Sequence, residues 1–202
     1  MTDDYKVPPR SAKEIEAIVL AWRDRLGDPN DWAPCMVRLL EIELPKIPRL
    51  GQFALITRSD LEMGDAEAYT QFNPPHIVVR NSVYQLARKA NGRSRMTLAH
   101  ELGHLVMHPG ASKLRSDWSR PDADLKPYES AEWQANKFAS LFLMPSHIAR
   151  EFVSPTQLAE SCRVSHQAAQ IRFGELTHAS KPLPECIVET IEQLNRHSTD
   201  ST

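Results

Sequence analysis

The pattern of hydrophobic and polar positions divides the chain into helical segments on either side of a short central stretch of strands. Residues 1–10 are mostly polar and predict a loose leader. Ser11 and Glu14 then match the capping box that begins many helices. Four large apolar residues follow at helical spacing: Ile15, Ile18, Val19 and Trp22. The pattern predicts a helix from Ser11 that ends near residues 27–29, and a second short helix over 36–43.

The hydrophobic period then changes to that of strands. Short stretches over 53–56, 66–71 and 76–79 are separated by turn-forming residues, which predicts a small sheet. Helical spacing returns over residues 82–90, and the following Asn91-Gly92 is typical of a helix end.

The second half of the chain is predominantly helical in pattern. A helix is predicted over 94–107, before Pro109, and another over 130–143. Residues 111–128 have no period and predict a long loop. The tail from Ser154 onward predicts two or three further helical pieces.

These elements predict an α+β fold. In this fold a small mixed sheet packs against the helix over 94–107 and the helix over 130–143, followed by a helical C-terminal extension. We divide the chain into a domain over residues 1–150 and a helical C-terminal region over 151–202, helix-turn-helix-like and packed on the first.

Composition narrows the classes of function. The formal net charge is -2 and the pI about 6.4, which argues against direct nucleic-acid binding and against a membrane-surface role. Three widely spaced cysteines favour free thiols in a reducing compartment. The polar N-terminus and the lack of an apolar run of about 18 residues predict a cytoplasmic protein without a membrane span.

The chemistry-bearing motif is His100-Glu101-Leu102-Gly103-His104, an HExxH sequence within a predicted helix. Residues four apart lie on one face of a helix, so both imidazoles can bind one Zn²⁺. Glu101 then lies beside the metal-bound water as its general base. Packed or solvated histidines are the alternative, and the triplet on an apolar helix favours the metal site.

A catalytic zinc takes a third protein ligand. The metzincin pattern would need Gly at 107 and His at 110, and the chain has Met107 and Gly110. His108 follows His104 by one turn at the helix end, where a supporting or surface role fits better than ligation.

A carboxylate on the helix over 130–143 is the other option. Glu132 would ligate the ion, and Asn136, on the same face, would hydrogen-bond the second nitrogen of a ligating histidine. An acidic residue is also favoured in any first helical turn, and Glu129 is a competing carboxylate.

Two longer runs carry a resemblance. Arg93 to His108 contains TLAHELGH, and Glu132 to Ala139 reads EWQANKFA, followed by Leu143-Met144-Pro145. Both blocks resemble the ImmA/IrrE family of metallo-endopeptidases over roughly residues 66–145. Gln134 departs from the glutamate that the family often has.

The resemblance implies a zincin-like peptidase domain with zinc held by His100, His104 and Glu132, and Glu101 as catalytic base. It also implies an intracellular protein substrate, commonly a helix-turn-helix repressor whose cleavage derepresses stress or mobile-element genes. The same ligands also accept ions such as Mn²⁺.

The reaction itself sets the remaining expectations. Zinc lowers the pKa of its water to about 7, and Glu101 carries the proton to the leaving amine. Candidates for contact with the oxyanion or substrate are Arg95, His108 and Tyr128.

A second class of function competes with the peptidase: a regulatory or protein-binding module whose metal site is structural or vestigial. Residues 154–176 resemble a helix-turn-helix, but Cys162-Arg163 replaces the usual turn glycine. The segment also lacks a basic excess for phosphate contacts. We therefore expect a helical pair that packs on the first domain or receives a protein partner.

Overall fold

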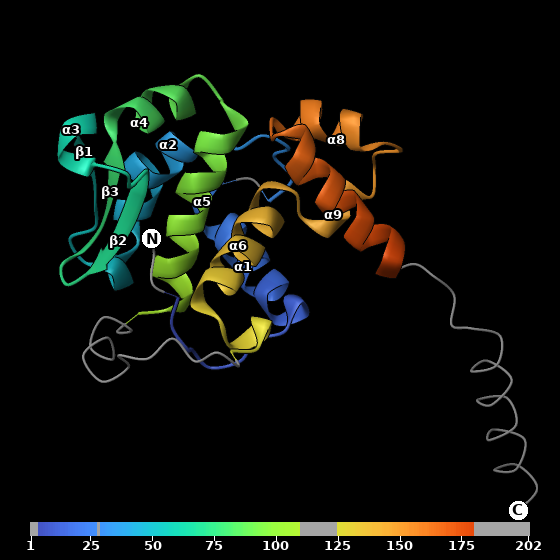
Figure 1. The fold of residues 1–202 in the computed structure, drawn as a ribbon, viewed down its shortest axis with the longest axis horizontal. Coiled ribbons are helices and arrows are strands. Elements are labelled where there is room, and N and C mark those ends of the chain that lie inside the picture. Colours follow the sequence, from blue (N-terminus) through green and yellow to red (C-terminus); the bar gives the residue numbers. More distant parts are fainter. Residues whose placement is uncertain (1–3, 28, 110–124, 180–202) are drawn as a thin grey trace, which may run out of the picture.

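Helix α5 (Gly92–Met107) is the central element of the molecule. The computed structural model describes residues 4–27, 29–109 and 125–179. A three-stranded sheet lies against one side of α5, and helices α6 (Ala131–Leu143) and α1 (Ala12–Leu26) lie on the other (Figure 1). This arrangement confirms the predicted α+β fold with a small mixed sheet packed against the two helices.

The N-terminal segment, residues 4–10, is ordered against the start of α6, so the prediction of a loose leader is wrong for these residues. The backbone N–H of Val7 donates to the carbonyl of Glu129 at 2.8 Å. The Asp4 carboxylate accepts a hydrogen bond from the Ser130 hydroxyl at 2.6 Å. These partners lie about 120 positions further along the chain, where no local sequence pattern can reveal them.

The first helices follow the predicted pattern. Ser11 and Glu14 form the capping box of α1, and the apolar face of this helix is buried. The predicted helix over 36–43 is also confirmed. It begins as α2 (Met36–Arg38) and continues as a π-helical turn, η1 (Leu39–Glu43). Two short 3-10 turns, η2 (Leu44–Lys46) and η3 (Pro48–Leu50), lead to the sheet.

The sheet has the strand order β1-β3-β2. Strand β1 (Ala54–Arg58) runs parallel to β3 (Pro75–Arg80), and β2 (Ala68–Phe72) runs antiparallel to it. The short helix α3 (Asp60–Met63) lies between β1 and β2 in the chain. Strand β3 is central, which explains its run of buried residues, Ile77, Val78 and Val79.

The junction before α5 differs from the prediction. Helix α4 (Asn81–Arg88) ends earlier than expected, and Ala90 takes the left-handed backbone conformation with φ 59°. Asn91 does not end α4 but caps α5, because its side chain accepts from the backbone N–H of Ser94. Asn and Gly favour both kinds of helix terminus, so the dipeptide alone did not separate them.

The C-terminal helices pack on the rest of the molecule. After α7 (Ser146–Ala149), α8 (Pro155–Cys162) and α9 (His166–Ala179) form an adjacent pair (Figure 1). Arg163 turns the chain between them in the left-handed conformation, with φ 50°, where a glycine would be usual. Buried residues of this pair belong to the same hydrophobic cluster as the first 150 residues: Leu158, Cys162, Ala169 and Leu176.

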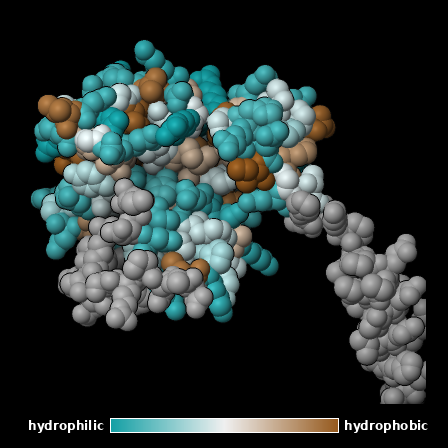
Figure 2. Space-filling model, viewed as in Figure 1, coloured by the Kyte–Doolittle hydropathy of each residue, from teal (hydrophilic) through white to brown (hydrophobic). Residues whose placement is uncertain are grey.

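Several expectations concern residues that the structure leaves undescribed. The predicted loop over 111–128 falls outside it as far as residue 124, and residues 127–129 form the 3-10 turn η5 (Pro127–Glu129). The tail beyond residue 179 also falls outside it. Within the described residues, no helix has the length and apolar character needed to cross a membrane. The visible face in Figure 2 is mainly hydrophilic, with separate hydrophobic patches.

Candidate metal centre

Helix α5 carries His100 and His104 one turn apart on the face toward α6. The helix is anchored by buried apolar residues on its other faces, among them Leu98, Leu102 and Leu105. Both imidazoles are largely shielded from solvent, with side chains 16% and 9% exposed. The sequence expectation that HExxH lies within a buried helix is thereby met.

Helix α6 brings a carboxylate to the same place. Glu132 lies in the first turn of α6, where Ser130 caps the helix by accepting from the Trp133 N–H. The two helices approach closely at Gly103. A Cβ at that position would lie 3.1 Å from the Cβ of Phe138. The glycine of the motif therefore sets the spacing at which the carboxylate can meet the imidazoles.

Three ligand atoms converge between the helices. The Nε2 atoms of His100 and His104 are 3.0 Å apart; that of His100 lies 3.3 Å from Oε2 of Glu132 and that of His104 lies 3.3 Å from Oε1. Ligand atoms about 2.0–2.1 Å from a tetrahedral zinc lie about 3.3 Å apart, so each of these separations is close to that between two ligands of such an ion. Two imidazole nitrogens and one carboxylate are also a donor set that suits zinc. This group of residues can bind a metal ion.

The carboxylates and imidazoles of the group shift one another's pKa values. Burial disfavours the protonated form of His100, but hydrogen bonding to Glu132 and the charges of Glu101 and Glu132 outweigh burial and raise its pKa. Burial also acts to raise the pKa of Glu132, and the two histidines reverse this effect and lower it to about 2. Both directions show that an ionised carboxylate and a positive charge favour one another at this place.

Glu101 is buried beside the group and is held from the sheet. Glu101 is only 6% exposed, and its negative charge acts to raise the pKa of His100. The Thr70 hydroxyl, on strand β2, lies 2.7 Å from Oε2 of Glu101 and 3.0 Å from its backbone carbonyl oxygen. One carboxylate oxygen of Glu101 is thus fixed by the edge strand β2.

Partners of the second ring nitrogens are also in place. Oδ1 of Asn136 lies 2.9 Å from Nδ1 of His100, as the spacing on α6 predicts. Nδ1 of His104 faces Nδ1 of His108 at 3.2 Å. Burial lowers the pKa of His108 to about 4. His108 therefore lies behind His104 as a neutral partner, a position that does not suit the predicted contact with an oxyanion.

Arg95 is a second correction. The side chain is 1% exposed, and its guanidinium donates to the backbone carbonyls of Pro34, Cys162 and Arg163. These bonds tie α5 to the α8–α9 turn and to the loop before α2, so Arg95 has a buried structural position instead of the predicted contact with a reacting group.

The two remaining candidates lie just before α6. Tyr128 is 42% exposed in η5, with Nζ of Lys126 5.8 Å from its ring centre, and its contact with substrate stays a prediction. The competing carboxylate, Glu129, pairs with Lys6 at 3.4 Å and lies outside the group.

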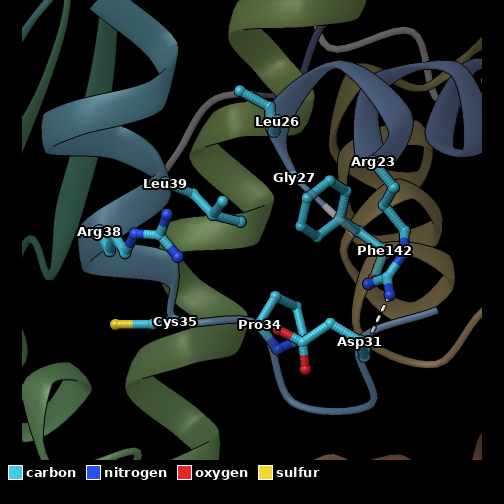
Figure 3. A pocket seen from close by; sticks show the side chains of 9 residues that line it. All are labelled: Arg23, Leu26, Gly27, Asp31, Pro34, Cys35, Arg38, Leu39 and Phe142. Atoms are coloured by element: carbon cyan, nitrogen blue, oxygen red, sulfur yellow. Dashed lines mark hydrogen bonds between the residues drawn. The ribbon is translucent and has the colours of Figure 1, made fainter. Parts of the chain in front are cut away.

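A separate hollow lies between the end of α1, the loop that follows it, and α2 (Figure 3). Its buried cation, Arg23, donates to the carbonyls of Pro29, Asp31 and Phe142. These bonds hold the loop against α6, which gives the arginine a structural role there.

Sequence reasoning missed several residues around the metal group. Thr70 could have been suggested by its place in a strand that alternates toward α5, but its register was unknown. In the sequence, Gln134 stands out only as a departure from a family pattern. It is fully buried, and its amide bonds to the N-terminal segment. Only the tertiary fold brings that segment and Gln134 together.

Comparisons with known proteins identify the family and support the fold. The family model for the IrrE N-terminal-like domain, peptidase M78, matches residues 54–173. A solved structure, a Mycobacterium tuberculosis transcriptional regulator, is similar with a TM-score of 0.53 and 16% identity. The similarity covers 78% of this chain and 45% of that chain, so the chain spans less than half of that protein, and the likeness shows the fold. No curated protein matches the chain.

The family match extends over more than half of the chain and includes the HExxH helix, the helix of Glu132, α8 and the first part of α9. It confirms the resemblance drawn from the two sequence blocks. The chain belongs to the peptidase M78 family, with an IrrE N-terminal-like domain.

Proposed function

We propose that this chain is a zinc-dependent endopeptidase that cleaves a regulatory protein inside the cell. His100, His104 and Glu132 would hold the ion, and Glu101 would be the general base. The observation that carries the proposal is the convergence of two imidazole nitrogens 3.0 Å apart, each 3.3 Å from one oxygen of the Glu132 carboxylate, with the buried Glu101 beside them, in a chain of a peptidase family.

Each residue of the site would have a separate role in hydrolysis. When bound, zinc supplies Lewis-acid activation of a water molecule and of the scissile carbonyl. Glu101 takes a proton from the attacking water through the carboxylate oxygen that Thr70 leaves free, and passes it to the leaving amine. Burial of the group limits competing water and strengthens these interactions. Asn136 and His108 hold the two imidazoles in orientation.

The substrate class follows from the resemblance of the two motif blocks to the ImmA/IrrE family. We propose a DNA-binding repressor of the helix-turn-helix type, cleaved in the cytoplasm. The chain's small net charge supports a protein partner over direct binding to nucleic acid. The rival function, a binding module with a vestigial metal site, would retain the ligands but need no base at position 101.

The test compares the parent chain with Glu101→Gln and His104→Ala. We expect one zinc per chain in the parent and in Glu101→Gln by elemental mass spectrometry, and none in His104→Ala. New protein N-termini are then profiled in cells that express each chain. Glu101→Gln should lower cleavage at least about 100-fold, because it removes the general base and keeps the ligands.

Glu129→Gln is the matched control, since this nearby carboxylate pairs with Lys6 and lies outside the group. It should keep both zinc and cleavage. If Glu101→Gln produces the same new N-termini as the parent, the peptidase proposal is wrong and the binding-module function takes its place.

A further inference from the structure

A chain of hydrogen bonds leads from His104 away from the metal group. Nδ1 of His104 lies 3.2 Å from Nδ1 of His108, and Nε2 of His108 lies 3.2 Å from Oε1 of Gln134. All three side chains are buried. Such contacts between groups that can either donate or accept have a direction, and that direction decides which nitrogen of His104 holds its proton.

The far end of the chain fixes the direction. Nε2 of Gln134 lies 2.9 Å from the carbonyl oxygen of Pro8 and 2.8 Å from that of Tyr128, and these oxygens can only accept. Nη1 of Arg10, which can only donate, lies 3.0 Å from Oε1 of Gln134. The amide is therefore held in one orientation, with its oxygen toward His108.

The orientation of the Gln134 amide determines which ring nitrogens of His108 and His104 carry hydrogens. Because Oε1 of Gln134 accepts, Nε2 of His108 must carry a hydrogen. Arg10 already places a positive charge on the same amide oxygen, and His108 is 4% exposed, so a second buried cation is disfavoured and the ring is neutral. Its Nδ1 is then an acceptor, so Nδ1 of His104 carries the hydrogen.

The consequence is a lone pair on the atom that faces Glu132. With its hydrogen on Nδ1, neutral His104 directs an unprotonated Nε2 toward His100 and Glu132. The opposite tautomer would place a hydrogen where a metal ion must bind.

We propose that His108 and Gln134 are positioning residues, which, with Arg10 of the N-terminal segment, hold His104 in the tautomer that binds a metal ion. This inference rests on the proposed metal site. It also assigns a purpose to the departure at position 134, because only an amide can donate to two carbonyls while accepting from His108.

The experiment uses His108→Phe, which fills the space without ring nitrogens, and His108→Asn, whose amide oxygen can accept from Nδ1 of His104. Zinc affinity is measured by competition with a chelator. We expect His108→Phe to bind zinc about 10- to 100-fold more weakly, and His108→Asn to recover to within about threefold of the parent. Arg10→Ala keeps both rings and should weaken binding by a smaller factor.

Lys6→Ala is the matched control. Lys6 belongs to the same N-terminal segment but pairs with Glu129, so its removal should leave zinc affinity unchanged. A loss in Lys6→Ala equal to that in Arg10→Ala would show general loosening of the segment and overturn the inference.

A second measurement does not require metal. Two-bond ¹H–¹⁵N correlations of the histidine rings in the metal-free chain report the tautomer of His104, which should be Nδ1–H in the parent and lose that preference in His108→Phe. If the parent binds no zinc but shows these spectra, the proposed function fails and the hydrogen-bond chain stands. Unchanged spectra and zinc affinity within twofold in His108→Phe would overturn the inference.

Discussion

Replacing Arg95 by methionine tests whether this buried arginine holds the structure or contacts a reacting group. Hydrogen bonds to charged groups contribute about 1.5–3 kcal/mol each, so its bonds to three carbonyls together are worth about 4.5–9 kcal/mol. Desolvation of the guanidinium, which also lowers its pKa, costs several kcal/mol in return. We expect the free energy of unfolding to fall by about 3 kcal/mol, and Tm by about 6–12 °C.

The assay is equilibrium unfolding in urea, followed by tryptophan fluorescence, with zinc content measured on the folded variant. Arg93→Met is the matched control, because Arg93 lies two residues earlier with an exposed side chain paired to Glu67. Its effect should stay within about 0.5 kcal/mol. If Arg95→Met unfolds like the parent but has lost peptidase turnover, the assignment to structure is wrong and the predicted oxyanion contact is restored.

The remaining predictions concern two glycines that lie close to neighbouring residues and one buried cysteine thiol. Gly103→Ala should cost about 1 kcal/mol and weaken zinc binding in a chelator assay, because its Cβ meets the buried Phe138; unchanged affinity would contradict the role of the glycine in helix spacing. Gly92→Ala should cost about 2 kcal/mol and expose the α8–α9 turn to limited proteolysis, since its Cβ would lie 2.7 Å from that backbone; parent-like resistance would refute the close contact. Burial raises the pKa of the Cys162 thiol to about 11, so iodoacetamide at pH 8 should modify exposed Cys35 and spare Cys162, as peptide mass spectrometry would show. Because this pKa lies above the ordinary 9.0, the thiol's contribution to stability should be lost as the pH rises from 9 toward 11 in a urea series.

Elements with strong local signals were predictable. The capping box of α1, the strand period of the sheet and the apolar faces of α5 and α6 each reflect interactions within a few residues. The metal group was predictable for a related reason. A helical turn brings His100 and His104 together by spacing alone, and only Glu132 needed a second helix.

Long-range interactions set the limit of prediction. The N-terminal segment pairs with residues near the start of α6, and the sheet places Thr70 against Glu101, although neither contact has a local pattern. The mistake about Arg95 has the same origin. An arginine next to a catalytic motif suggests contact with substrate, and only the packed α8–α9 turn shows that this side chain is buried against backbone carbonyls.

The close packing of the α8–α9 turn against α5 has a consequence for how the family can diversify. At Gly92 the two backbones touch, and at Arg95 one helix supplies donors to carbonyls of the other unit. The C-terminal helix pair and the HExxH helix therefore pack as one unit. A lineage that exchanges this pair for another domain must also change positions 92 and 95, and we expect the three features to vary jointly among homologues.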